Sequence, residues 1–519
     1  MKTSIIVFLF CIFLTYSSLS QSLSINTDGS TANASAMLDV KSTTKGLLIP
    51  RMSRSERNAI ASPATGLLIF QNSPDSVGFY YYTGATWAWL NSSATSDTLV
   101  WKTLGNANTI DGQHFIGTTD NIPLTIKVNN IKSGRIDHIN YNSFWGYKAG
   151  LSNNAFANSA FGAFALQNSV SGDGNNAFGY LALTNNNGGT QNVAMGLSAL
   201  QSNTVGNENI AIGTSSLQLN INGSWNTAIG TQALYLNIAG GGNTAVGFYS
   251  LQNNTAHFNS AVGYGALQNN TNGSWNTALG ASALTNNTTG SSNTGIGYFA
   301  LNSNVAGNTA TAIGYYAMRY TNNSSTGFPN SNVAVGFQSL YGSSIPSNNT
   351  GLNNTAVGYE SLLSNTSASD NTAHGCQVLI SNTTGGDNTA IGSKVLIQNT
   401  TGANNTAIGS NALGSNLSGN NNTTLGYYSG YSSIGSGNVF LGYNAGYNET
   451  GSNKLYIANS NTTTPLIGGD FTSGVVTIKS LLTLSPTTTP ASPVKGMVYF
   501  DNITNKLRCY DGSVWNDLW

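Results

Sequence analysis

The alternation of apolar and polar residues is regular over residues 142–453. The phrase Asn-Thr-Ala-Ile-Gly-Ser occurs at 388–393 and again at 405–410, 17 residues later. Its side chains alternate with period two, which is typical of a short β-strand. The Asn- and Gly-rich segments between phrases tolerate positive φ, as turns require. The pattern therefore predicts a unit of about two short strands and two turns, and it disfavours helix because glycine and β-branched residues recur in every copy.

The repeat keeps its register along the whole segment. The glycine that ends each phrase, here the landmark glycine, occurs 18 times from Gly146 to Gly442, and 12 of the 17 spacings are 17 residues. Two spacings of 22 residues flank Gly336 and indicate local insertions. Asn stands four residues before the landmark in every unit except that of Ala310. A unit this short must stack on copies of itself to bury a core. The predicted fold is all-β, a parallel β-roll or β-solenoid of about 18 coils.

Stacking converts each repeat position into a column of like residues about 4.8 Å apart, so the roll becomes a rod of roughly 80 Å. The Asn column is expected to form an amide ladder along the rod. The Ala and Gly columns form a flat face that another backbone can approach, either the opposite wall of the coil or another subunit. The Ile/Val column before the landmark glycine is expected to point inward.

Short β modules flank the roll. Residues 62–87 and 492–515 share the order Ser-Pro, Gly, apolar strand, polar turn, aromatic strand and Tyr-x-Gly-x-x-Trp, which predicts a β-hairpin in each. The first lies in an N-terminal strand, helix and hairpin module at 21–97, and the second in a C-terminal module at 486–519. Residues 98–141 and 454–485 are mixed β segments, and we expect them to cover the two open ends of the roll.

The N-terminus has the features of a secretory signal peptide. Lys2 precedes the apolar run 5–14, and small residues follow it, which predicts cleavage after residue 20. The run is too short to span a bilayer, and no other apolar stretch approaches the length required. We therefore expect a mature chain without a transmembrane segment, located outside the cell or on its outer surface.

Charge is scarce and balanced, with 18 basic and 18 acidic residues in 519. No basic patch is available for phosphate contacts, which argues against nucleic acid as a partner. After cleavage only Cys376 and Cys509 remain, so the sequence predicts no disulfide framework.

The stacked Asn-Ser/Thr-Ala-Ile/Val-Gly phrases resemble the head repeats of trimeric autotransporter adhesins, the YadA-like family. The resemblance covers about residues 142–453. It implies a left-handed parallel β-roll in which three chains associate side by side, with the Ala/Gly and Ile/Val columns among the close contacts. This chain departs from the family in its longer repeat, and it lacks both a heptad-patterned stalk and a barrel-type membrane anchor. The flanking modules are similar to pieces of fibre-like surface proteins and phage tail-fibre-type proteins.

The search for chemistry yields few candidates. Glu360 and Asp370 come from adjacent coils, but scattered acids are expected to be solvated loop charges rather than a carboxylate pair. His374 and Cys376 flank one landmark glycine, and three copies of His374 in a trimer could meet an ion. A tolerated substitution is the simpler interpretation. No residue is predicted to be catalytic, to bind a cofactor or to ligate a metal.

Aromatic residues are the better binding candidates. Trp225 and Trp275 each lie in an Asn-Gly-Ser-Trp-Asn turn, where an exposed ring would contact a ligand and a folded-back ring would cover its own turn. Aromatic residues directly after the landmark glycine form a partial column, which we expect to cover a coil edge or a subunit seam rather than to stack on sugars.

The sequence thus predicts a secreted or cell-surface homotrimeric fibre protein, an adhesin-like binding or spacing element with an unknown ligand and no enzymatic activity. Three alternatives stay open: an ice-binding β-solenoid, a phage tail-fibre-like receptor-binding protein and, disfavoured by the scattered acids, a polysaccharide-degrading β-solenoid.

Overall fold

A computed structural model describes residues 22–73, 76–90, 109–110 and 115–518. The expected signal peptide at 1–20 lies outside these residues. The chain divides into two compact units, one up to Gly117 and one from Thr118 onward. Within the described ranges, no helix has the length and apolar character needed to cross a membrane.

The first unit holds two small sheets. Strand β1 (Leu23–Asn26) pairs in parallel with β2 (Leu38–Lys41). A second sheet has the order β3 (Arg51–Ser53), β4 (Leu68–Ser73), β5 (Gly78–Tyr82) and β6 (Trp87–Trp89). Helix α1 (Arg54–Asn58) follows β3, and Ser53 with Glu56 forms a capping box at its start.

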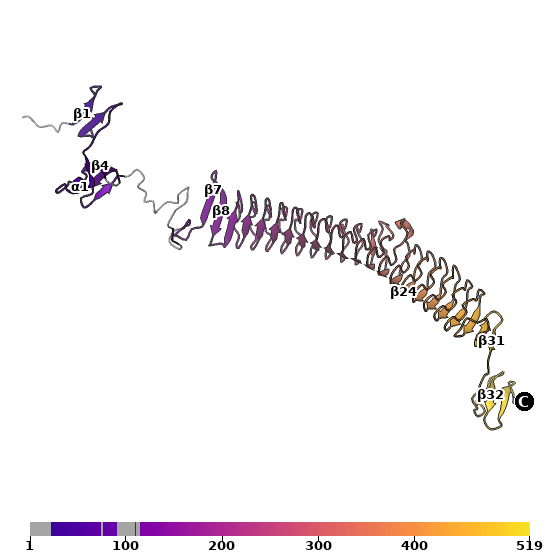
Figure 1. Cartoon of the computed structure of the whole chain (residues 1–519). Helices are drawn as coiled ribbons and strands as arrows, with labels where there is room; N and C mark the ends of the chain where they lie inside the picture. The colour runs from indigo at the N-terminus through magenta and orange to yellow at the C-terminus, as the bar shows by residue number, and fades with distance from the viewer. Residues whose placement is uncertain (1–21, 74–75, 91–108, 111–114, 519) are drawn as a thin grey trace, which may run out of the picture. The chain divides into compact units, whose positions relative to one another are not determined.

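The second unit contains the roll, which Figure 1 shows as a ladder of successive coils. Each coil contributes one short strand that pairs in parallel, without register shift, with the strands of the coils before and after it. The strands are β9 (Asn142–Trp145), β10 (Ser159–Phe161), β11 (Asn176–Phe178), β12 (Val193–Met195), β13 (Ile210–Ile212), β14 (Thr227–Ile229), β15 (Thr244–Val246), β16 (Ser260–Val262), β17 (Thr277–Leu279), β18 (Thr294–Ile296), β20 (Thr311–Ile313), β22 (Val333–Val335), β23 (Thr355–Val357), β24 (Thr372–His374), β25 (Thr389–Ile391), β26 (Thr406–Ile408), β27 (Thr423–Leu425), β28 (Val439–Leu441) and β29 (Lys454–Ile457). The predicted parallel β-solenoid is confirmed.

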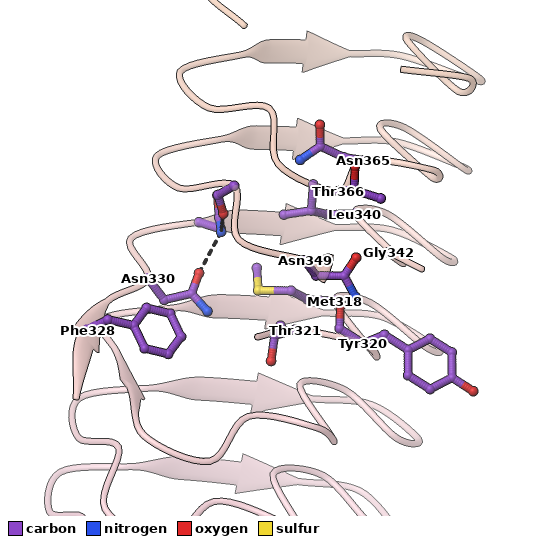
Figure 2. A pocket seen from close by; sticks show the side chains of 12 residues that line it. Met318, Tyr320, Thr321, Phe328, Asn330, Leu340, Gly342, Asn349, Asn365 and Thr366 are labelled. Atoms are coloured by element: carbon purple, nitrogen blue, oxygen red, sulfur yellow. Dashed lines mark hydrogen bonds between the residues drawn. The ribbon is translucent and has the colours of Figure 1, made fainter. Parts of the chain in front are cut away.

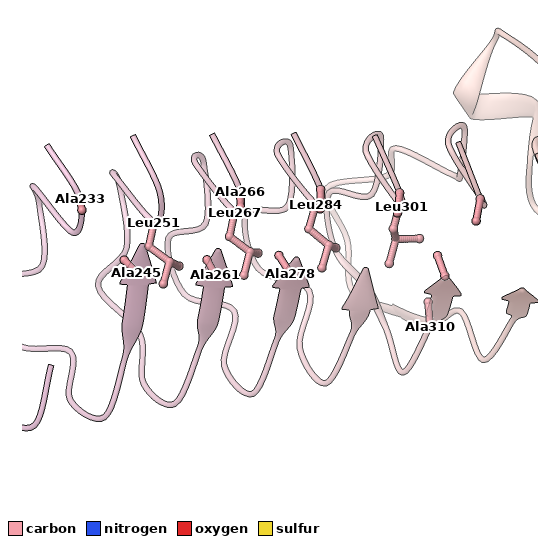
Figure 3. Packing of buried hydrophobic residues seen from close by; sticks show 14 of the residues in the cluster. Ala233, Ala245, Leu251, Ala261, Ala266, Leu267, Ala278, Leu284, Leu301 and Ala310 are labelled. Atoms are coloured by element: carbon pink, nitrogen blue, oxygen red, sulfur yellow. The ribbon is translucent and has the colours of Figure 1, made fainter. Parts of the chain in front are cut away.

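The core of the roll is a double column of alanine and leucine. The middle residue of nearly every strand is a fully buried Ala, and the Leu four residues after the landmark glycine is buried opposite it, as Figure 3 shows for Ala245 and Leu251. The strand residues on either side of Ala face outward. The expected inward orientation of the Ile/Val column is therefore wrong, because only one residue of a three-residue strand can face the narrow core.

The opposite wall of each coil is not a second strand, which corrects the expected two-strand unit. Residues two and four positions after the landmark, such as Gln232 and Leu234, adopt positive φ of 56° and 51°. Their N–H groups still donate to neighbouring coils, Gln232 to Thr214 O at 2.9 Å and Leu234 to Ser250 O at 3.0 Å. A left-handed conformation costs about 1–2 kcal/mol, and complete burial of Leu returns about 1.5–3 kcal/mol.

The landmark glycine is fixed by the stacking itself. Gly230 has φ +131°, and a Cβ at this position would lie 2.6 Å from the carbonyl oxygen of Gly247 in the next coil. The close backbone approach predicted for this column therefore occurs between successive coils, along the axis of the roll.

Two buried amide ladders run beside the core. In the predicted ladder, four residues before the landmark, Asn226 donates from its N–H and its Nδ2 to Asn209 Oδ1, at 3.0 and 3.1 Å. A second ladder, which the sequence reasoning missed, stands seven residues after the landmark: Asn237 Nδ2 donates to Asn220 Oδ1 at 3.0 Å. Both Asn226 and Asn237 also donate to the carbonyl of Gly240, so the two ladders share acceptors across the coil.

The insertions beside Gly336 leave the strands in register and interrupt the ladders. They hold β21 (Phe328–Pro329), which pairs with β19 (Gly307–Asn308) of the preceding regular coil, and the short 3₁₀ turn η1 (Pro346–Asn348). Ala310 replaces one Asn of the first ladder and so leaves Asn332 without the usual acceptor. Asn330 supplies it, because its Oδ1 accepts from Asn332 Nδ2 at 2.6 Å.

Antiparallel strands cover both ends of the roll. At the start, β7 (Leu124–Val128) pairs with β8 (Ile131–Asp137), which pairs with β9. At the end, β29 pairs with β30 (Ile467–Asp470), which pairs with β31 (Val475–Ile478). The C-terminal sheet comprises β32 (Val498–Asp501), β33 (Lys506–Tyr510) and β34 (Trp515–Asp517).

Candidate interaction surfaces

An exposed apolar stripe follows the strand face of the roll. It consists of the residue directly before each landmark glycine, which is apolar in every coil except that of His374, and of the aromatic residues directly after some of these glycines. Ile229 in β14 is 38% exposed, and Leu425 in β27 is 53% exposed. The parallel register places each of these residues over its counterpart in the next coil. The exposed aliphatic members include Ile212, Ile229, Val262, Leu279, Ile313, Ile391 and Leu425. A long exposed apolar stripe is typical of surfaces that contact another protein.

Aromatic residues complete the stripe and stack on one another. The rings of Tyr298, Tyr315, Phe337 and Tyr359 follow in four successive coils, with centroid separations of 5.4, 5.5 and 5.2 Å and interplanar angles of 24° or less. The faces of successive rings lie against one another, so the rings present mainly their edges to the outside. This arrangement favours packing against a protein surface over stacking on sugars, which requires a free ring face.

Arg319, five residues after the landmark Gly314, packs beside this aromatic run. The guanidinium of Arg319 lies 5.0, 4.3 and 4.9 Å from the ring centroids of Phe299, Tyr316 and Tyr320. Such cation–π contacts fix the orientation of a side chain whose charge faces three rings.

A small cavity of about 20 Å³ is lined in part by Met318 and Tyr320, the two chain neighbours of Arg319, and has room for about one water molecule. Figure 2 shows the side chains that line it, including Met318, Thr321 and Asn349. Thr321 stands here in place of an Asn of the second ladder. The Oγ1 atom of Thr321 and the Oδ1 atom of Asn304, one coil earlier, are buried and have no hydrogen-bond partner. The cavity is thus the defect left by the break in that ladder.

A separate aromatic group occupies the turn before the strand. Trp225 and Trp275 are 65% and 64% exposed, so their rings do not fold back over their own turns. Phe258, from the coil preceding that of Trp275, is also exposed, and its ring stacks on Trp275 with centroids 6.3 Å apart. Gly242 makes room for Phe258, because a Cβ there would lie 2.7 Å from the ring. The sequence reasoning missed Phe258, whose position five residues before the landmark is the same as that of both tryptophans.

The chemically suggestive residues are dispersed. His374 and Cys376 are both exposed. Glu360 accepts from Gln377 Nε2 at 2.9 Å, and Asp370 accepts from Asn353 Nδ2 at 3.1 Å, so the two carboxylates bond to amides in different columns. In the part of the chain that the structure describes, no three His, Cys, Asp or Glu side chains are grouped so as to hold a metal ion.

Ionisable groups concentrate at the two ends of the roll. At the start, Lys132 of β8 donates to the carbonyl of Gly150 and lies 5.2 Å from the ring centroid of Phe144. Burial lowers the pKa of Lys132 to about 8, and the positive charge of Arg135 adds to this effect.

At the far end, Tyr456 donates to Glu449 at 2.6 Å, and Lys454 pairs with Asp470 at 2.8 Å. Burial and the bond to Glu449 raise the pKa of Tyr456 to about 12. These residues line a cleft of about 500 Å³ beside β30 and β31.

Comparison with known proteins finds one family match, in the N-terminal region. Residues 24–105 match the model of a family described as the phage tail-like trimerisation region. The matched range contains the sheets β1–β2 and β3–β6 and lies outside the roll. No curated protein and no solved structure matches the chain. The similarity of the roll to YadA-like heads therefore stays a prediction. A trimerisation region joined to a β-solenoid fits a trimeric fibre-type protein.

Proposed function

We propose that the protein is a secreted or cell-surface trimeric fibre that acts as an adhesin-like binding or spacing element rather than as an enzyme. The observation that carries the proposal is the apolar stripe, which runs along the roll in one register and is interrupted before the landmark glycine only by His374. Three parallel copies would bury their stripes against one another over the length of the roll. The trimerisation match at residues 24–105 supports the same stoichiometry.

The surfaces outside the stripe suit contact with a ligand. Trp225, Phe258 and Trp275 project from a turn that precedes the strand and would stay exposed after the stripe is buried. Tryptophan combines a large apolar area with a hydrogen-bond donor and is enriched where proteins bind partners. A phage tail-fibre-like receptor-binding role uses the same trimeric architecture and would differ only in the surface that is recognised.

One observation keeps the ice-binding alternative in view. In the five successive coils with Thr355, Thr372, Thr389, Thr406 and Thr423, the threonine lies three residues before the landmark, at least partly exposed and in register. Within the described residues these hydroxyl groups have no hydrogen-bond partner in the chain. Thermal hysteresis of the purified protein would support this function, and its absence would leave the fibre proposal alone.

The decisive measurement is the mass of the full chain by light scattering, which should be three times the chain mass. The triple substitution Ile212→Asp, Ile229→Asp and Ile391→Asp on the stripe should dissociate or strongly destabilise the trimer. The matched control changes Ile221, Ile238 and Ile345 to Asp; these residues are all more exposed but lie off the stripe. A monomeric wild-type chain, or equal effects of the two triples, would overturn the proposal.

A further inference from the structure

The C-terminal sheet repeats the strand pairing of the N-terminal β4–β6 sheet, with a connection between its first two strands that is two residues shorter. Leu68 pairs with Tyr81 and Phe70 with Phe79, and in the same register Val498 pairs with Cys509 and Phe500 with Leu507. The turns before the sheets also agree. Gly66 and Gly496 share a φ of +87°, and each donates from its N–H to the carbonyl of the tyrosine that ends the second strand of the hairpin, Tyr82 O or Tyr510 O, at 2.7 Å. The pattern of burial is identical over 61–70 and 491–500.

One face of the C-terminal sheet is covered and polar. Asp501, buried there, accepts from Tyr499 Oη and from Arg508 Nη1, both at 3.1 Å. The Tyr499 ring packs edge-on against Trp515, and the Tyr499 hydroxyl bonds to Thr489 in the preceding segment. The backbone N–H of Ile503 donates to Asp501 at 2.9 Å and, with the other bonds, holds the pKa of this carboxyl well below its usual range.

The other face is apolar and uncovered. Because side chains alternate along a strand, Val498, Phe500, Leu507 and Cys509 share it, and Leu518 follows on the edge beside Leu507. Val498 is 43% exposed and Leu518 is 52% exposed, and the others are half-buried. The sheet therefore presents its apolar side to the outside, which is the reverse of what a soluble hairpin requires.

The C-terminal module is also too small to be stable alone. Of its described residues, Tyr499 is the only apolar one among the buried core residues. Domains below about 40 residues usually need disulfides, metals or oligomerisation. The module has a single cysteine, Cys509, and no histidine, so an internal disulfide is excluded and a metal site is disfavoured.

The equivalent face of the N-terminal sheet identifies the partner. Leu68, Phe70, Phe79 and Tyr81 form the same outward apolar face, with Phe70 and Phe79 in edge contact at 5.1 Å. This sheet lies inside the range that matches the trimerisation family. We propose that the C-terminal module is a second self-association site, in which the faces of Val498, Phe500, Leu507 and Cys509 from three copies pack together. The inference rests on the trimeric fibre proposed above and adds a clamp at the C-terminal end of the fibre.

The test uses the thiol that this face already carries. In the full chain with Cys11→Ser and Cys376→Ser, a short bis-maleimide should join Cys509 of one copy to Cys509 of another and give covalent dimers, with no larger species because each chain then offers one thiol. Adding Leu507→Asp should reduce the dimers at least tenfold. Adding Ile503→Asp, in the exposed turn of the same module, should leave them unchanged.

Hydrogen exchange gives a readout that needs no substitution. The amides of 498–509 should exchange at least tenfold more slowly in the wild-type chain than in the Leu507→Asp chain, while the roll serves as an internal reference. A chain that is trimeric by light scattering but forms no Cys509-linked dimers would overturn the clamp and leave the fibre intact. Dimers that are insensitive to Leu507→Asp would overturn the assigned face. A monomeric chain would overturn both proposals.

Discussion

At the residue scale, the roll depends on side chains that serve the coil above and the coil below at once. Asn276 donates to Asn259 Oδ1 and to Gly290 O, while its own Oδ1 accepts from the backbone N–H and the Nδ2 of Asn293. All of these groups are buried. An isolated coil could not satisfy them, so the stack stabilises each residue that builds it.

Replacing Asn276 by Ala should therefore cost about 2 kcal/mol, because the Asn293 N–H would stay buried without a partner and the Gly290 carbonyl would keep only its bond from Asn287. Asn269→Ala is the matched control. Asn269 stands in a column on the outer surface of the roll. Its amide accepts from Asn253 Nδ2 at 3.2 Å and reaches Asn286 at 3.5 Å, and solvent can replace both bonds, so its loss should cost only about 0.5 kcal/mol. Urea unfolding followed by circular dichroism compares the two. Equal losses would contradict the buried ladder as the source of stability.

The same scale explains what the sequence revealed and what it hid. The Asn, Gly and Leu columns were visible because stacking demands the same residue in each coil. The outward direction of Ile229 was not visible, because period two fixes which residues share a face but not which face is inside. Ala228 decides the direction, since the gap to Leu234 admits only a small side chain. The second Asn ladder was legible in the repeat spacing, three residues after each Leu.

At the element scale, β8 closes the start of the roll with a buried cation. The folded-state pKa of Lys132, about 8, lies below the unfolded value of about 10.4. Between these values the unfolded chain binds the proton more tightly, so the free energy of unfolding rises with pH over this window. Below about pH 8 both states are protonated, and the cost of burying the charge is fully present.

We predict that the melting temperature difference between pH 10 and pH 7 is more positive in wild type than in Lys132→Met. Lys127→Met, an exposed lysine on the adjacent strand β7, is the control and should behave as wild type. A Lys132→Met chain with the wild-type pH dependence would show that this lysine does not determine the stability of the end.

The ends also show where sequence reasoning about candidate sites is weakest. Lys132 and Tyr456 belong to segments outside the repeat, and Glu449 belongs to its atypical last unit, so no column marked them. Their pKa shifts arise from burial and from contacts that only the folded ends create. Trp225 and Trp275, by contrast, were identified because they interrupt a polar column, and the structure adds Phe258 between them.

At the scale of the whole molecule, the roll behaves as a sum of interchangeable coils. Deleting residues 214–247 joins Gly213 to Phe248 and removes two whole coils, because both junction positions keep their place in the repeat. The shortened chain should fold, keep its oligomeric state and lose about 10 Å of length. Deleting residues 214–238 instead shifts the register and should prevent folding. Small-angle scattering measures the length, and a folded out-of-register chain would contradict the column model.

The direction of the hydrogen bonds has a mechanical consequence. The bonds between coils, such as Gly247 N–H to Ile229 O, join neighbours along the shaft and not across it. A pulling force on the two ends of a chain therefore loads these bonds at one coil boundary at a time, and rupture proceeds by peeling. Each released coil of 17 residues yields up to about 60 Å of slack. A fibre of this design, held at both ends, would lengthen in steps of about one coil. It would dissipate mechanical energy at its end before the remainder of the shaft unfolds.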